Sequence, residues 1–414
     1  MADLSKIIDK KDEAAKYMEE EITYICKNLP KRDPGSEGEK LACEYMAEQL
    51  KKDCGCDNVA IDSFEEHPKS FFGWVFFTVS FILAAIVLFF FVPIASLFLV
   101  VAGLFVCFMQ IIIYKHFIDW AFPKKIGHNV YGTKKPTGEV KRRILFNGHP
   151  DAVWEMHFHY RFGCIVFESH WVFSILGSLY YIALSIAYLI KHGVSAGVAD
   201  IHDPIVIAAL VGLVFVPVFI ALYFLADYKT VVDGANDNLT GCYMGIALLK
   251  YLQDNNITFE NTEIGVVNTG SEEAGIRGAE AFSKRHNKDF SDVPTVVYSF
   301  DTIHDPNQLM VNYRDLQGFL KMDKELADLF LNSAEELGIP CKKGMVPFFG
   351  GATDTVGFRR GGMRAAGITG LNHKLEDYYH TRRDTYDNLN LEGLANCFAI
   401  TAKVLEHFDE GKLD

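Results

Sequence analysis

Five short segments of the sequence place metal-binding residue types at the end of an apolar stretch or in a polar turn. They are Phe146–Asp151 (FNGHPD), Asp233–Gly241 (DGANDNLTG), Thr269–Gly275 (TGSEEAG), Tyr298–Asp301 (YSFD) and Tyr378–Thr385 (YYHTRRDT). Histidine nitrogens and carboxylate oxygens are common zinc ligands in proteins. Each segment alone also has a structural explanation, because Gly, Asn and Asp are frequent in turns. Together the segments indicate a metal site assembled from several strand ends.

Two of these segments indicate what chemistry such a site could perform. Asp151 follows His149 by two residues, so its carboxylate can hold one imidazole N–H while the other nitrogen binds a metal ion. Glu272 and Glu273 are adjacent carboxylates, which repel each other unless cations or protons compensate. One of them can bind a metal ion while its neighbour faces a bound water molecule. The alternative for this pair is a solvated acidic helix N-terminus, which the helix dipole also favours.

Taken in order, the five segments resemble the di-zinc aminopeptidase family, which includes bacterial leucyl aminopeptidases, glutamate-carboxypeptidase-like enzymes and glutaminyl cyclases. That family shows His-x-Asp after a central strand, then Gly-Ala-x-Asp-Asn-x-x-Gly, Glu-Glu-x-Gly, an Asp, and a late His-Thr-x-x-Asp-Thr. The same elements stand here at 149–151, 234–241, 272–275, 301 and 380–385. In the family the first two elements are usually close together, whereas here a long hydrophobic segment separates them.

The resemblance implies two zinc ions per chain and a role for each motif residue. The implied metal ligands are His149, Asp237, Glu273, Asp301 and His380. Asp237 would bridge the ions, with His149 and Asp301 completing one site and Glu273 and His380 the other. The implied catalytic residues are Glu272, as general base, and Asp151, which would orient His149. The same ligand types also accept cobalt or manganese.

The activity that the resemblance implies is hydrolysis of a peptide substrate by metal-activated water, with release of the N-terminal residue. A carboxypeptidase, a dipeptidase or a glutaminyl cyclase could use the same site. A non-catalytic membrane receptor or scaffold is the alternative outside the enzymes, although the complete ligand set argues against it.

The segments that must position these residues alternate between strand and helix patterns. Predicted strands are 58–64, 128–132, 143–146, 263–268, 295–300 and 364–368, and predicted helices are 241–252, 274–285, 324–337 and 391–408, with two more within 1–52. Ser36 and Glu39 suit a capping box at the start of the second of these. Such alternation predicts an α/β fold. The resemblance specifies it further, as a three-layer α/β/α zinc-exopeptidase (phosphorylase/hydrolase-like) fold with a mixed, mostly parallel central sheet.

Long uncharged runs interrupt this pattern. Phe71–Tyr114 contains 44 residues without a charge, and Trp171–Ile190 and Pro204–Ala226 are uncharged as well. A bilayer core needs about 20 helical residues, so the runs predict four transmembrane helices in two hairpins. Buried helices of a soluble core are the alternative, but they rarely stay uncharged over such lengths.

The predicted organisation is a peptidase domain with two membrane insertions. Residues 1–70, 115–170 and 227–414 would form the peptidase domain, and 71–114 and 171–226 the two transmembrane hairpins. Because His149 and Asp237 must meet at one site, the segment between them must cross the membrane an even number of times. The spans contain no Asp, Glu, Lys or Arg, which argues against a transporter.

Charge and cysteine content indicate the partners and the compartment. The net charge of −13 argues against a nucleic-acid partner, which leaves a peptide substrate and the lipid bilayer. The nine cysteines form no disulfide framework, and the N-terminus lacks the pattern of a signal peptide. Basic residues flank the spans mainly on the catalytic side, namely Lys69, Lys115, Lys124, Lys125, Arg161 and Lys229, against Lys191 on the other. The positive-inside rule therefore predicts a multi-pass membrane protein with a cytoplasmic catalytic domain.

Overall fold

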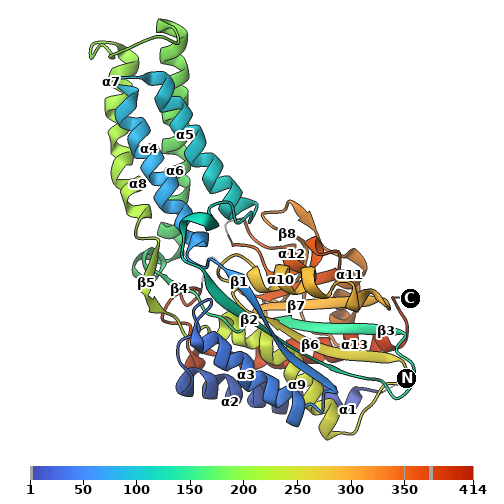
Figure 1. The fold of residues 1–414 in the computed structure, drawn as a ribbon. Coiled ribbons are helices and arrows are strands. Elements are labelled where there is room, and N and C mark those ends of the chain that lie inside the picture. Colours follow the sequence, from blue (N-terminus) through green and yellow to red (C-terminus); the bar gives the residue numbers. More distant parts are fainter. Residues whose placement is uncertain (1–2, 349, 373–375, 414) are drawn as a thin grey trace. The chain divides into compact units, whose positions relative to one another are not determined.

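The computed structural model describes residues 3–348, 350–372 and 376–413 (Figure 1). The chain forms two compact units. Unit 1 comprises Met1–Pro68, Lys124–Glu155 and Lys229–Asp414, and unit 2 comprises Lys69–Pro123 and Met156–Tyr228. Each unit is therefore built from segments that are separated in the sequence by parts of the other.

Unit 1 is organised around a nine-stranded mixed sheet. Its strands are β1 (Asn58–Glu66), β2 (Lys125–Lys134), β3 (Arg142–Gly148), β6 (Thr262–Thr269), β7 (Thr295–Ile303), β8 (Met310–Asp315), β9 (Leu320–Lys321), β10 (Lys342–Met345) and β11 (Arg364–Gly370). They follow the order β1-β2-β6-β3-β7-β11-β8-β10, with β9 beside β8. The central strands β6, β3, β7 and β11 are mutually parallel, whereas β1 and β2 are antiparallel additions at one edge.

Helices cover both faces of this sheet. Alternate residues of β3 enter two separate cores, with Ile144 and Phe146 on one face and Leu145 on the other, as the period of a strand requires. The first core receives α2 (Lys11–Asn28), α3 (Glu37–Lys52), α9 (Thr240–Asp254), α11 (Lys324–Glu336) and α13 (Leu391–Asp409). The second receives α10 (Arg277–His286) and α12 (Asp354–Arg360). The predicted three-layer α/β/α fold with a mixed sheet is confirmed.

Most predicted elements of unit 1 are present, with differences at their ends. The helix expected from Ala274 begins at Arg277, because Ser271 and Ile276 both have φ of 56° and interrupt a helical path. The predicted capping box is half formed. Ser36 accepts the backbone N–H of Glu39, but the Glu39 side chain accepts the backbone N–H groups of Gly35 and His128 instead.

Unit 2 contains four helices long and apolar enough to cross a membrane: Ser70–Phe89, Pro93–Ile112, His157–His192 and Pro204–Leu222. The third, α6, begins at His157 rather than in the uncharged run at Trp171. Its first turns carry Arg161 and Glu168, and Gly163 interrupts the helical geometry with φ of 78°. The uncharged run therefore marked only part of this helix.

The helices of unit 2 pack through small residues and hydroxyl groups. The first two approach closely at Gly103, where a Cβ atom would stand 3.1 Å from the backbone oxygen of Thr78. The Thr78 hydroxyl donates to the Gly103 carbonyl at 2.8 Å, and the Tyr181 hydroxyl donates to the Ala209 carbonyl at 3.0 Å. Close backbone approach and hydroxyl hydrogen bonds are typical of helix packing in membranes.

Candidate metal centre

The predicted ligands lie at one edge of the central sheet because the strands that carry them are parallel. His149 directly follows β3, Glu272 and Glu273 follow the turn after β6, and Asp301 lies near the end of β7. The carboxyl ends of parallel strands meet at the same edge, which is where open α/β sheets place their ligands. The parallel sheet thereby brings together residues that follow or end three different strands.

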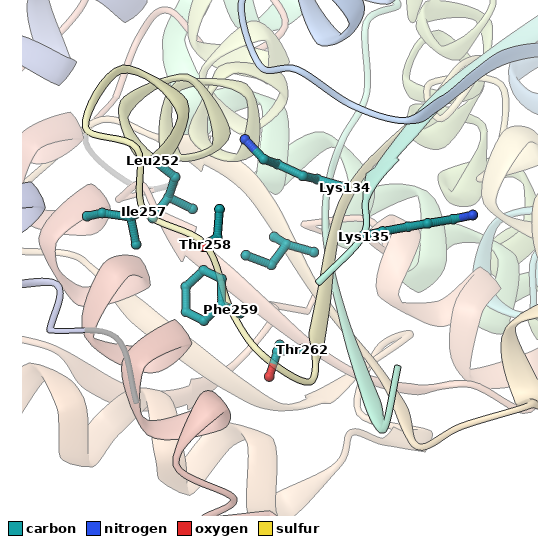
Figure 2. Close-up of a pocket in the computed structure, with 8 residues that line it drawn as sticks. Lys134, Lys135, Leu252, Ile257, Thr258, Phe259 and Thr262 are labelled. Atoms are coloured by element: carbon teal, nitrogen blue, oxygen red, sulfur yellow. The ribbon is translucent and has the colours of Figure 1, made fainter. Parts of the chain in front are cut away.

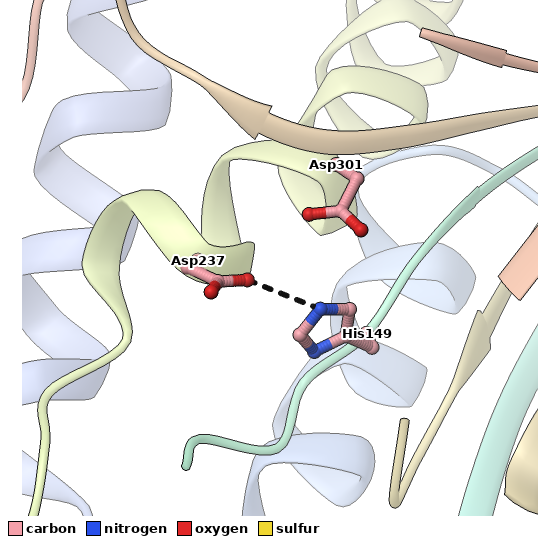
Figure 3. A group of neighbouring side chains, drawn as sticks. All are labelled: His149, Asp237 and Asp301. Carbon is pink, nitrogen blue, oxygen red and sulfur yellow. Dashed lines mark ion pairs between the residues drawn. The ribbon is translucent and has the colours of Figure 1, made fainter. Parts of the chain in front are cut away.

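The structure brings all five predicted ligands into two groups that could each hold a metal ion. His149, Asp237 and Asp301 form one group, shown in Figure 3, and Asp237, Glu273 and His380 form the other. In each group the candidate ligand atoms lie within 4.8 Å of one another. Asp237 belongs to both, with one oxygen 3.3 Å from His149 Nε2 and the other 3.1 Å from His380 Nε2. This geometry suits a carboxylate that bridges two cations.

Asp237 is held in place by the irregular turn that precedes α9. Gly234 has left-handed φ of 58°, and a Cβ atom there would lie 2.7 Å from the Asp237 carbonyl oxygen and 2.8 Å from Ala152 Cβ. The Asp384 carboxylate accepts the backbone N–H groups of Asn236 and Asp237, at 2.8 and 3.1 Å. A motif near the end of the chain therefore fixes the turn that presents the shared carboxylate.

Asp151 fixes the Glu272–Glu273 turn in the same manner. Its two oxygens accept the backbone N–H groups of Glu272 and Glu273, at 3.1 and 3.0 Å. One of these oxygens also lies 3.4 Å from His149 Nδ1. Asp151 therefore contacts the imidazole that it is predicted to orient, and it also joins two ligand-bearing segments, which the sequence did not indicate.

Negative charge dominates the electrostatics of the site. Burial raises the pKa of Glu272 and Glu273 well above the ordinary value, and nearby carboxylates add to the effect. Burial and Asp237 raise the pKa of Asp301 to about 7. Burial also acts to raise the pKa of Asp237, but His149 and His380 hold it below the ordinary value. Cations would relieve the repulsion among these buried carboxylates.

In the described part of the chain, several buried ligand atoms lack hydrogen-bond partners, and this indicates whether the two groups could hold metal ions. His149 Nε2, Asp237 Oδ2 and Glu273 Oε1 are buried and have no hydrogen-bond partner among the described residues. Buried polar atoms are ordinarily paired, because an unpaired one is costly. All three belong to the two ligand groups, so the donor set fits a pair of zinc ions.

Two supporting contacts were not predicted from the sequence. Arg382, two residues after His380, donates to the buried Glu155 from Nε at 2.6 Å and from Nη2 at 2.8 Å. Thr269 donates to Asp354 at 2.5 Å, and burial raises the pKa of Asp354 to about 7. Arg382 lies in the last motif, but the sequence did not indicate its partner.

A separate pocket lies on unit 1 (Figure 2). Its lining residues are Lys134, Lys135, Leu252, Ile257, Thr258, Phe259, Thr262 and Ile264. None of them is a predicted metal ligand, so this pocket is distinct from the metal centre.

Part of the chain matches a known peptidase family. Residues 222–405 match the model of Peptidase family M28. This stretch contains four of the five predicted ligands and Glu272, whereas His149 precedes it. The predicted resemblance is confirmed, together with its expectation of a zinc-dependent metallopeptidase. A search of curated proteins found no match.

Solved structures share the fold. A zinc aminopeptidase from Bacillus subtilis aligns with a TM-score of 0.54 at 11% identity, over 95% of each chain. An aminopeptidase from Aneurinibacillus sp. strain AM-1 aligns with a TM-score of 0.54 at 13% identity, over 96% of this chain and 95% of that one. A glutaminyl cyclase from Porphyromonas gingivalis aligns with a TM-score of 0.53 at 11% identity, over 96% and 98%.

Proposed function

We propose, from the premise that this chain is a zinc metallopeptidase, that it is a membrane-anchored exopeptidase that releases N-terminal residues from peptides. The observation that carries the proposal is the pair of ligand groups that share Asp237 beside the buried carboxylate of Glu272. In this proposal His149, Asp237 and Asp301 hold one zinc ion, and Asp237, Glu273 and His380 hold the other.

Glu272 is the proposed general base. When bound, the two zinc ions lower the pKa of a water molecule and polarise the scissile carbonyl. The Glu272 carboxylate, which lies 3.8 Å from His149 Nε2, would accept a proton from that water and deliver it to the leaving amine. Because Asp151 holds Glu272 through its backbone N–H, the side chain stays available for proton transfer.

The charges around the centre favour an amino-terminal substrate. A substrate with a free N-terminus carries a positively charged ammonium group. The surplus of carboxylates around the centre would attract this group. A carboxypeptidase must instead bind a free carboxylate with a cation. The guanidinium of Arg382 is the cation nearest in sequence to His380, and it is already held by both oxygens of Glu155, an arrangement that satisfies a guanidinium well.

The apolar helices of unit 2 support anchoring in a lipid bilayer. In the proposed arrangement, residues 71–114 and 171–226 are transmembrane hairpins, and 1–70, 115–170 and 227–414 form a cytoplasmic peptidase domain. Lys69 Nζ lies 5.3 Å from the centre of the Tyr228 ring, so the first and last residues of unit 2 meet at one end. Lys191, in the last turn of α6, pairs with Asp203, which caps the start of α7 (Pro204–Val211).

Matched substrates test the proposed reaction. The purified full-length chain in detergent should carry two zinc ions and cleave aminoacyl substrates with a free α-amine, while N-acetylated counterparts are cleaved at least 100-fold more slowly. Equal cleavage of the blocked substrates would exclude an aminopeptidase. Ammonia release from an N-terminal glutaminyl peptide by a chain with one zinc ion would indicate a cyclase. A metal-loaded chain inert toward all of these peptides would favour the receptor or scaffold.

A further inference from the structure

Arg32 connects the two segments of unit 1 that flank the second apolar insertion. It lies between α2 and α3, and its guanidinium donates from Nε to the Pro150 carbonyl at 2.6 Å. Nη2 donates to the carbonyls of Asp233 and Gly234, the latter at 3.1 Å. The segment of unit 2 that spans Met156–Tyr228 lies between these two attachment points in the sequence.

Both attachment points are next to predicted metal ligands. Pro150 follows His149 directly, and Gly234 opens the turn that carries Asp237. The backbone of Arg32 joins the same segment, because its carbonyl accepts the N–H of Ala152 at 2.9 Å. A single side chain therefore contacts the backbones that present two of the three proposed ligands of one zinc ion.

The burial of Arg32 indicates a positioning role rather than a general contribution to stability. The side chain is only 2% exposed, and its guanidinium donates to three backbone carbonyls. Burying a cation away from water carries a large desolvation cost, which a well-packed apolar side chain would avoid. The planar guanidinium can, however, donate in two directions at fixed geometry, which a lysine cannot do.

We propose that Arg32 is a positioning residue for the zinc ion held by His149, Asp237 and Asp301. By bonding to both flanking backbones, it sets the separation of the His149 and Asp237 segments after the long excursion of the chain between them. This inference rests on the proposed metal sites. Its loss should lower the affinity for this ion more than for the other, because Glu273 and His380, which hold the other ion together with the shared Asp237, lie on segments that Arg32 does not bond to.

The test measures zinc affinity rather than activity. Arg32→Met and Arg32→Lys variants of the full chain in detergent are titrated with zinc against a chromophoric chelator, and the thermal unfolding of each metal-free form is recorded. Arg142→Met is the matched control. Arg142 also donates to two carbonyls, those of Phe408 and Asp409, at 3.2 and 2.7 Å, but these lie away from the ligand segments.

Loss of a group that orients a metal ligand typically lowers affinity about 10–100-fold. We expect a loss of that size for one zinc ion in Arg32→Met, a smaller loss in Arg32→Lys, and none in Arg142→Met. Wild-type affinity for both ions in the two Arg32 variants would overturn the inference. So would an affinity loss that follows the unfolding temperature across all three variants.

If Arg32→Met does not fold, Arg32→Lys alone decides. Weakened binding of one ion by Arg32→Lys supports the inference, and unchanged binding of both ions overturns it. A wild-type chain that binds no zinc would instead contradict the proposed function, so the two failures are distinguishable.

Discussion

The Asp384 carboxylate accepts two hydrogen bonds from Asn236, at 2.8 Å from the backbone nitrogen and 2.9 Å from the side-chain amide. A third hydrogen bond comes from the backbone N–H of Asp237. The last motif of the chain therefore supplies His380 to one metal group and also holds the carboxylate that both groups share. Hydrogen bonds to charged groups contribute about 1.5–3 kcal/mol each, so Asp384 is a main determinant of the Asp237 position.

Replacing Asp384 should therefore weaken zinc binding. In Asp384→Asn, the amide NH2 would face the N–H donors of Asn236 or Asp237, and we expect about 10–100-fold lower zinc affinity. Zinc titration against a chelator measures this. Asp387→Asn, three residues later in the same loop, is the control and should bind as the wild type does. Unchanged affinity in Asp384→Asn would show that the turn before α9 holds its own geometry.

Glu272→Gln should separate turnover from metal binding. The amide keeps the size of the side chain, and the Glu272 backbone bond to Asp151 does not depend on it. Loss of a general base lowers the rate about 10²–10⁴-fold, so we expect kcat to fall by that amount while two zinc ions remain bound. Glu280→Gln, on α10 where Glu280 pairs with Arg360, should leave both quantities unchanged. Full activity in Glu272→Gln would assign the base elsewhere.

A buried pair of carboxylates makes stability depend on pH. Ser271 Oγ lies 2.6 Å from a Glu39 oxygen and 2.7 Å from a Glu66 oxygen, yet its one O–H can donate to only one of them at a time. Burial, and in each case a neighbouring carboxylate, raises the pKa of both Glu39 and Glu66 to about 8. Because the folded-state pKa exceeds the unfolded value of about 4.5, the stabilisation is full below about pH 4.5. It is lost as the pH rises through about 8.

Glu66→Gln should accordingly flatten this pH dependence. An amide cannot ionise, so the unfolding temperature of the variant should fall less than that of the wild type between pH 5 and 9. Thermal unfolding of the full chain in detergent measures the slope. Glu65→Gln is the control, because Glu65 is exposed and pairs with Lys124, and surface pairs contribute little. Equal slopes in Glu66→Gln and wild type would contradict the raised pKa of Glu66.

The proposed orientation can be tested with two epitope insertions. Gly197, in the loop after α6, and Gly338, after α11, both have open surroundings that tolerate an insertion. In sealed vesicles with the cytoplasmic face outward, protease should remove an epitope at Gly338 and leave one at Gly197 intact until detergent is added. The reverse pattern would place the peptidase domain on the other side of the membrane. Loss of both epitopes without detergent would contradict the placement of the loop after α6 on the opposite side of the membrane from the peptidase domain.

The sequence predicted which side chains lie together, because their chemistry and their position at strand ends are both local signals. His149, Glu273 and Asp301 each follow or end an apolar strand, and a parallel sheet brings such positions together without further information. The partners of Asp384 and Arg32 could not be predicted in the same way. Arg32 bonds to backbone carbonyls, and two of the three hydrogen bonds to Asp384 come from backbone N–H groups. Every residue possesses these atoms, so such partners leave no trace in the sequence.

Segment boundaries were less predictable than segment types. The helix α6 extends to His157 because helix formation tolerates Arg161 and Glu168, whereas a search for uncharged runs stops at them. The start of α10 moved to Arg277 because the left-handed residues Ser271 and Ile276 carry no distinctive side chain. Elements such as β9 and β10 are too short to show periodicity.

The packing of α2 against α13 has a consequence for biosynthesis. These helices stand near opposite ends of the chain, and unit 1 joins those ends through bonds from Leu4 to Glu406 and from Lys11 to Asn396. The apolar stripe of α2, which includes Met18 and Ile22, packs against α9 and α13, and it consequently lacks both partners while the ribosome completes the four long apolar helices. Unfinished chains with exposed apolar surface tend to aggregate. The nascent protein should therefore depend on a chaperone from the synthesis of α2 until α9 and α13 are available to cover it.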